Sequence, residues 1–145
     1  MKYFSGLLAA LLFLGVVTGW SAAQDVQTYV NQGVKNSQEG HYDQALQAFD
    51  QALKLKPKDP ALITYKGIVY YAKGQNGQAI QLFEEAIKLN PNFGRAYYQR
   101  GMIYEKQEKY DQALTDLQKA KNLGYGVDPD FIEYMKRKAA GLQRK

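Results

Sequence analysis

The fold of this chain is decided by the stretch YDQAL at residues 42–46, which recurs unchanged at residues 110–114. A related stretch, NGQAI, lies between them at residues 76–80, so successive copies are 34 residues apart. A fixed period of this length is the sequence signature of stacked structural repeats. The chain is therefore expected to consist of repeated units and not of a single irregular domain.

The same register extends well beyond this stretch. Each copy has a glycine twelve residues before its alanine, a large apolar residue four residues after it and a second alanine three residues later. These positions are Gly33, Gly67 and Gly101; Phe49, Phe83 and Leu117; and Ala52, Ala86 and Ala120. Apolar residues spaced three and four apart form one face of an α-helix, and the first half of each unit has helical spacing too. The spacing therefore predicts two helices in each unit.

The glycines and the helix ends give further expectations. A glycine inside a helix costs about 1 kcal/mol relative to alanine, so close packing is the expected compensation. We expect the three glycines to face small residues across the helix pair, namely Ala45, Ala79 and Ala113. The pairs Asp59-Pro60 and Asp128-Pro129 predict capped helix starts, and Gly40 and Gly74 predict the turns inside the first two units.

This pattern closely resembles the tetratricopeptide repeat family. The resemblance implies an all-α fold, a right-handed α-solenoid of three helix-turn-helix units with a concave inner face and a C-terminal capping helix. It places the units at residues 26–59, 60–93 and 94–127, and the capping helix at residues 128–145. The resemblance thus covers nearly all of the chain after residue 23.

The chain departs from the family pattern at a few positions. Gln32, Lys66 and Arg100 replace the usual leucine, and Tyr125 stands where a third proline would follow Pro57 and Pro91. None of these changes interrupts the helical spacing.

The amino terminus has the features of a secretory signal. A positive start at Lys2 is followed by an apolar run over residues 7–17 and by small residues at 21–23. Ser21 and Ala23 satisfy the small-x-small rule, so we expect cleavage after Ala23. The expected folded domain is then residues 24–145.

The alternative for this segment is an uncleaved anchor formed by residues 3–20, since about 17 apolar residues can just span a bilayer. With cleavage we expect the bacterial periplasm or the exterior, and without it the inner membrane. Membrane contact is expected only if the segment stays uncleaved. The chain has no cysteine, which excludes acylation as a lipoprotein, disulfides and thiolate chemistry.

The charge is mildly basic, with a formal net value of +5. Part of the excess lies in the tail, at Lys136, Arg137, Lys138, Arg144 and Lys145. A nucleic-acid partner needs a concentrated basic face, so we expect none. We interpret these charges first as solvated surface and second as a means of attraction to an acidic or anionic surface.

The family resemblance also predicts where a partner binds, because the first helix of each pair lines the concave face. The positions that face outward are Gln27, Val30, Asn31 and Val34 in the first unit; Thr64, Tyr65, Ile68 and Tyr71 in the second; and Arg95, Tyr98, Gln99, Met102 and Lys106 in the third. Such a mixture of aromatic, aliphatic and amide side chains suits an extended or helical segment of another protein. Tyr70 and Tyr104 are expected to pack between helices instead.

Some members of the family grip the acidic carboxy-terminal tails of cytosolic chaperones with five clamp residues. In this register, lysine and asparagine of the clamp are replaced by Val30 and Val34, a second asparagine by Tyr65 and an arginine by Gln99. Only Arg95, in place of a lysine, keeps the charge. One match in five argues against this ligand.

Residues suited to catalysis are scarce. His41 is the only histidine and lies at a predicted turn, and the adjacent Glu84 and Glu85 diverge on a helix. No glycine-rich phosphate loop is present. We therefore expect no enzyme activity, no metal site and no cofactor.

The sequence favours a non-catalytic scaffold or adaptor of the cell envelope that binds another protein and is a monomer or a weak homo-oligomer. Two alternatives stay open: a self-associating structural scaffold, and attachment to a membrane or other anionic surface through the basic carboxy terminus.

Overall fold

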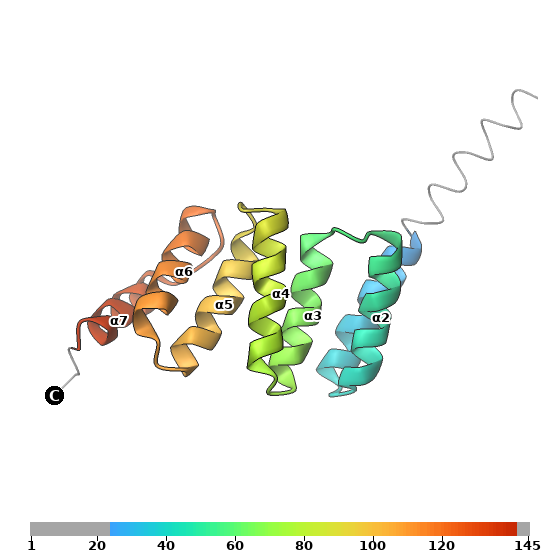
Figure 1. Ribbon diagram of the computed structural model, residues 1–145, viewed down its shortest axis with the longest axis horizontal. Coiled ribbons are helices and arrows are strands. Elements are labelled where there is room, and N and C mark those ends of the chain that lie inside the picture. The colour runs from blue at the N-terminus through green and yellow to red at the C-terminus, as the bar shows by residue number, and fades with distance from the viewer. Residues whose placement is uncertain (1–23, 142–145) are drawn as a thin grey trace, which may run out of the picture.

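The computed structural model describes residues 24–141, and all regular structure in that part of the chain is helical. Its helices are a helix over residues 24–38, α2 (Tyr42–Leu55), α3 (Pro60–Ala72), α4 (Asn76–Leu89), α5 (Gly94–Lys106), α6 (Tyr110–Asn122) and α7 (Pro129–Ala139). Figure 1 shows them stacked in chain order along one axis, each running opposite to the one before. The predicted all-α solenoid is confirmed.

Several predictions fall on residues outside this part. They are the signal segment at residues 1–23 with its cleavage after Ala23, and the last two basic residues, Arg144 and Lys145. Of the helices over residues 24–141, none is long and apolar enough to cross a membrane.

The core lies between the two helices of each unit and between neighbouring units. The repeated alanines Ala45, Ala79 and Ala113 have no exposed surface, and Phe49, Phe83 and Leu117 are at most 1% exposed. Burial of each of the three large side chains stabilises the fold by about 1.5–3 kcal/mol. Because every buried face belongs to two adjacent helices, the stability of the solenoid comes from contacts between neighbours.

The glycines of the first two units face aromatic rings and not alanines. A Cβ atom on Gly33 would lie 2.6 Å from the Phe49 ring, and one on Gly67 would lie 2.5 Å from the Phe83 ring. The prediction that these glycines face alanines was wrong. The residue opposite is the large apolar one, a helical turn after the alanine, and its ring occupies the space that a side chain would need.

The third unit is packed differently at the same position. A Cβ on Gly101 would lie 3.2 Å from side-chain atoms of Asp116 and Leu117 and 3.4 Å from the carbonyl oxygen of Ala113. Here the predicted alanine contributes one of the three nearest atoms, through its backbone.

The helix ends follow the predicted capping chemistry. The Asp59 carboxylate accepts a hydrogen bond from the backbone N–H of Ala61 at 2.9 Å, and Asp128 accepts one from Asp130 at 2.8 Å. Both caps satisfy donors that the first helical turn leaves free.

The turns inside the units use the left-handed backbone region. Gly40 and Gly74 have φ values of 79° and 77°. At the equivalent position of the third unit, Glu108 has a φ of 58°, which is uncommon for a residue with a side chain.

Candidate protein-binding groove

A hollow of about 170 Å³ opens between the first helices of the units. Four segments form its walls: the helix over residues 24–38, α2, α3 and α5. The lining side chains are Val34, Ser37, Gln38, Phe49, Tyr65, Ile68, Val69 and Arg95. Four of the residues predicted for the groove, Val34, Tyr65, Ile68 and Arg95, are therefore brought together in one place.

The floor of this hollow is a three-layer stack. The Tyr65 ring lies parallel to the buried Phe49 ring, with centroids 5.3 Å apart and 1° between the planes. The guanidinium carbon of Arg95 lies 4.5 Å from the centroid of the Tyr65 ring. Because Phe49 packs against Gly33 in the core, its position is fixed. The stacked rings thus hold the Arg95 guanidinium beside the apolar hollow. Most of the residues that line this hollow belong to the first two units.

A second cation on α5 is held in a similar way. The Lys106 ammonium lies 5.0 Å from the centroid of the Tyr71 ring, and the nearby Tyr71 side chain raises the pKa of Lys106. Within residues 24–141, neither Lys106 nor Arg95 has a carboxylate within ion-pair distance. Both groups therefore offer positive charge on the side of α5 that faces the α3 tyrosines.

The predicted Thr64 does not reach the surface. Its side chain is fully buried, and its hydroxyl donates a 2.7 Å hydrogen bond to the backbone carbonyl of Pro60. The prediction was wrong for this residue because a short side chain folds back onto the preceding helical turn instead of extending into the groove.

Tyr98 is only partly available, since its ring lies 4.9 Å from that of Tyr125. Tyr125 follows α6 at the position where the family usually has proline. Its ring therefore covers part of the Tyr98 ring. This contact was not predicted, because Tyr125 lies outside the repeated helical pattern.

The other predicted groove residues vary in exposure. Asn31 is exposed and accepts a 2.9 Å hydrogen bond from the Gln27 side chain. Val30 is half-buried and packs against the core of the first unit. Gln99 and Met102 are half-buried on α5.

Tyr70 and Tyr104 pack among the helices, as expected. Tyr70 lies against the core of the second unit and Tyr104 against that of the third. Burial raises the pKa of Tyr104.

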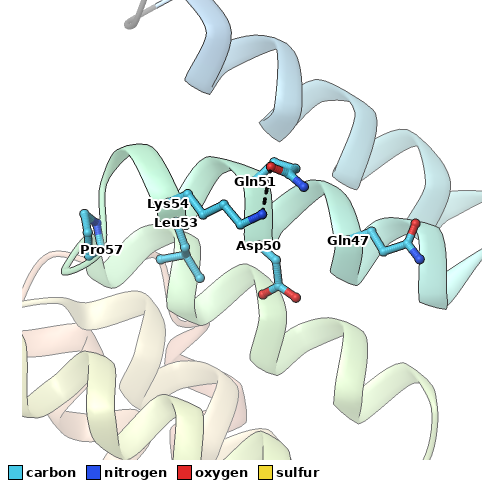
Figure 2. A pocket seen from close by; sticks show the side chains of 6 residues that line it. All are labelled: Gln47, Asp50, Gln51, Leu53, Lys54 and Pro57. Atoms are coloured by element: carbon cyan, nitrogen blue, oxygen red, sulfur yellow. Dashed lines mark hydrogen bonds between the residues drawn. The ribbon is translucent and has the colours of Figure 1, made fainter.

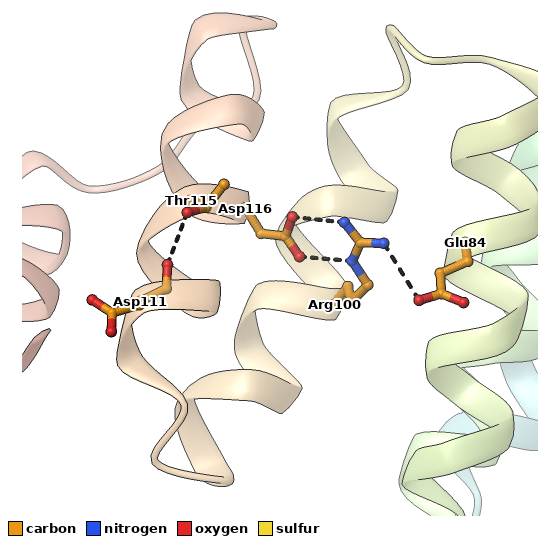
Figure 3. A network of polar contacts seen from close by, with 5 residues as sticks. All are labelled: Glu84, Arg100, Asp111, Thr115 and Asp116. Carbon is orange, nitrogen blue, oxygen red and sulfur yellow. Dashed lines mark hydrogen bonds and ion pairs between the residues drawn. The ribbon is translucent and has the colours of Figure 1, made fainter.

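An ion-pair network that was not predicted from the sequence joins α4, α5 and α6 (Figure 3). Arg100 donates from Nε and Nη2 to the two carboxylate oxygens of Asp116, at 2.7 and 2.8 Å, and its Nη1 lies 3.8 Å from Glu84. Hydrogen bonding to Asp116 raises the pKa of Arg100. In the second unit, Lys66 makes the equivalent inter-unit pair with Asp50 at 2.7 Å.

The sequence held a signal for this network. An acidic residue precedes each of these cations by sixteen positions, at Asp50 and Glu84, and Asp116 follows Arg100 by the same interval. Near the middle of these antiparallel helix pairs, residues sixteen positions apart face each other, as Gly33 faces Phe49 and Gly67 faces Phe83. The charged residues at the usual leucine position thus have structural partners.

A wider, shallow hollow of about 660 Å³ runs along α2 (Figure 2). Its lining comes from this one helix and the turn after it, and includes Asp50, Leu53 and Pro57. The Lys54 ammonium lies 3.3 Å from the Gln51 side-chain oxygen. Because a single segment provides all of its side chains, this hollow does not combine groups from several units as the smaller one does.

Comparison with protein families finds two matching models. The model described as TPR repeat matches residues 37–74 and 67–108, and the model described as Tetratricopeptide repeat matches residues 94–123. Together these matches extend over residues 37–123, which is more than half of the chain. No curated protein sequence matches.

Solved structures with the same fold are numerous. The chain is similar to the first TPR of Spaghetti (RPAP3) bound to the HSP90 peptide SRMEEVD, with 21% identity, a TM-score of 0.70, and 81% of this chain and 94% of that one covered. It is similar to the TPR2B domain of yeast Sti1 in a complex with pHsp70, with 20% identity, a TM-score of 0.69, and 83% and 99% covered.

The Sgt2 TPR domain from Aspergillus fumigatus is a third similar structure, with 23% identity, a TM-score of 0.70, and 79% of each chain covered. At these identities the likeness concerns the fold alone. Taken with the family matches and the 34-residue helical units, it shows that the chain belongs to the tetratricopeptide repeat family.

Proposed function

We propose that this protein is a non-catalytic interaction module that binds a segment of another protein on its concave face. The observation that carries the proposal is the hollow lined by Val34, Tyr65, Ile68 and Arg95. A cavity of roughly 150 Å³ accepts a benzene-sized group, so a hollow of about 170 Å³ has room for one apolar side chain of a partner. Its apolar walls with a few polar groups are typical of a recognition site.

The comparisons support binding of this general kind. The Spaghetti domain was solved with an HSP90 peptide, and the yeast Sti1 domain in a complex with pHsp70. These partners are not transferred to this chain, because Val30, Val34 and Tyr65 replace clamp residues of the members that grip chaperone tails. The shared feature is the use of a helical solenoid to hold a peptide.

The cellular location of the protein is a separate proposal. The apolar run at residues 7–17 and the small residues before Gln24 support export to the cell envelope, with the module released there after cleavage. Amino-terminal sequencing of the protein recovered from the envelope tests this. A start at Gln24 is expected, and a start at Met1 in the membrane fraction would favour the anchor instead.

A crosslinking pull-down from the native envelope tests the groove. The variant Val34→Gln, Ile68→Gln places two amides in the hollow and should lose most of the captured partner. The matched control is Leu55→Gln, Leu89→Gln, which alters two apolar residues that are 45% and 39% exposed and lie outside the hollow. Equal capture by all three proteins, with unchanged helicity, would contradict the groove as the binding site.

One observation supports self-association as a second candidate. Tyr134 is 44% exposed on α7 and stacks on Phe131 with centroids 6.3 Å apart. Sedimentation of the wild type and of Tyr134→Ser distinguishes the candidates. A concentration-dependent dimer that the substitution abolishes would favour self-association. A monomer in both cases would exclude self-association as the function.

A further inference from the structure

The two charged side chains of α5 that lie against the α3 tyrosines are both cations, the half-buried Arg95 and the exposed Lys106. Arg95 and Lys106 lie against the rings of Tyr65 and Tyr71, and no carboxylate of residues 24–141 pairs with either cation. The other cations of α3 and α5, Lys66 and Arg100, do have acidic partners. The groove cations therefore have unused capacity to bind an anion.

We propose that the segment bound in the groove is acidic, extended and internal to its own chain. It places one aliphatic side chain in the hollow, a carboxylate against Arg95 and a second carboxylate near Lys106. This inference rests on the proposed function, because it specifies the partner of the same groove. Charge complementarity selects the acidic residues, and the apolar walls formed by Val34 and Ile68 select the aliphatic one.

The spacing of the two cations sets the spacing of the acidic residues. Arg95 and Lys106 are eleven positions apart on α5, which is close to three helical turns and about 16 Å along the axis. An extended segment advances about 3.3 Å per residue. Side chains of an extended segment share a face only at even spacings, so the two acidic residues should lie four or six positions apart.

An extended backbone also suits the amides along the groove. Gln38 lines the hollow, and Gln99 is half-buried one turn after Arg95 on α5. Amide side chains both donate and accept hydrogen bonds, so they can pair with the exposed N–H and C=O groups of a peptide. A helical segment has already paired those groups within itself.

The surroundings of Arg95 favour a side-chain carboxylate over a chain terminus. A terminal carboxylate is captured by several donors that converge on it. Val30 and Val34 have no side-chain donor, and the Arg95 guanidinium is already fixed against a ring. One guanidinium can bind one aspartate or glutamate in a bidentate manner.

The first measurement is a selection of twelve-residue displayed peptides on the purified protein. We expect the enriched peptides to contain an aliphatic residue with aspartate or glutamate near it on the same face, and a second acidic residue four or six positions from the first. The strongest peptide is then synthesised with an amidated carboxy terminus and titrated by fluorescence anisotropy. Amidation should leave its Kd unchanged.

Substitutions then test each contact. Arg95→Gln should weaken this peptide about tenfold and Lys106→Gln by a smaller factor. Arg95→Lys keeps the charge but loses the bidentate geometry, so it should weaken the peptide by less than Arg95→Gln does. The matched controls Arg137→Gln and Lys88→Gln remove the same groups from exposed positions outside the groove and should change little. Circular dichroism of each variant verifies that the helices are intact.

The outcomes separate this inference from the proposed function. Peptides that lose binding with Ile68→Gln but show no acidic preference, or that are indifferent to Arg95→Gln, would overturn the acidic partner while leaving the groove as a binding site. If amidation abolishes binding, the internal segment is refuted. If no enriched peptide responds to Ile68→Gln, the groove itself fails, and this inference fails with it.

Discussion

The second and third units have the same helical register and close their helix pairs with different chemistry. In the second, the Phe83 ring packs over Gly67, and Leu82 lies beside it as a partly buried apolar side chain. In the third, Asp116 replaces Leu82 at the equivalent position and holds Arg100 through two hydrogen bonds. One backbone arrangement is thus stabilised by ring packing in one unit and partly by a buried ion pair in the next.

The comparison shows what the repeat requires of its residues. The interface needs filled volume and satisfied polar groups, and it does not need one particular residue type. A charged group at the leucine position is tolerated only where its partner is present. The units should therefore differ in their sensitivity to the same kind of substitution.

The largest difference is expected from removing the acidic partners. Asp116 is 5% exposed, and Asp116→Ala leaves the Arg100 guanidinium largely buried without its bidentate acceptor. Breaking such a pair should lower the free energy of unfolding by about 3 kcal/mol. Asp50→Ala removes the 52% exposed partner of Lys66 and should cost less than about 1 kcal/mol. Urea unfolding followed by circular dichroism measures both.

A double substitution sharpens this test. Arg100→Leu together with Asp116→Leu gives the third unit the family's usual leucine and the equivalent of Leu82. Replacing both members of a buried pair with apolar groups is often nearly neutral. We expect the double variant to be more stable than Asp116→Ala. If it loses as much stability as Asp116→Ala, the ion pair is not the reason for the difference between the units.

A smaller contrast is expected at the helix glycines. Gly67→Ala would place a methyl group 2.5 Å from the Phe83 ring, whereas in Gly101→Ala the nearest atoms are 3.2 Å away. Overpacking costs about 1–3 kcal/mol and the helical preference of alanine offsets about 1, so Gly67→Ala should lose up to about 2 kcal/mol. Gly101→Ala should change stability by less than about 0.5 kcal/mol. Thermal unfolding that ranks the two in reverse order would contradict this packing argument.

Features that recur along the chain were predictable from the sequence, because repetition reveals which positions are structural. The period of YDQAL and the alanine and phenylalanine positions predicted the helices and the buried core, and Asp59 and Asp128 predicted their caps. What faces each glycine was not predictable with the same accuracy. A one-turn shift along the opposite helix exchanges Ala79 for Phe83, and helical spacing alone does not fix that shift.

The groove was predicted in outline, and its exceptions lie at single residues. Val34, Tyr65, Ile68 and Arg95 do line one hollow, because their register places them on the same side of successive first helices. Thr64 shares that register but is buried, since the length of a side chain also decides whether it reaches the surface.

The turn inside each unit gives the smallest contrast. Gly40 and Gly74 occupy the left-handed region without strain, whereas Glu108 adopts it at φ 58°. A side chain in this region costs about 1–2 kcal/mol, and the extra freedom of glycine in the unfolded chain offsets about half of that. Glu108→Gly should therefore raise the free energy of unfolding by about 0.5 kcal/mol.

The reciprocal change isolates the backbone effect. A Cβ atom on Gly74 would have no neighbouring heavy atom within 4 Å, so Gly74→Glu introduces the conformational cost without a packing clash. We expect it to lower the free energy of unfolding by about 0.5 kcal/mol, as the mirror of Glu108→Gly. Opposite shifts in the urea midpoint, with equal slopes, would show that the third unit carries a strained turn that the other two avoid. If both variants are destabilised, the Glu108 side chain contributes a favourable contact that outweighs the strain.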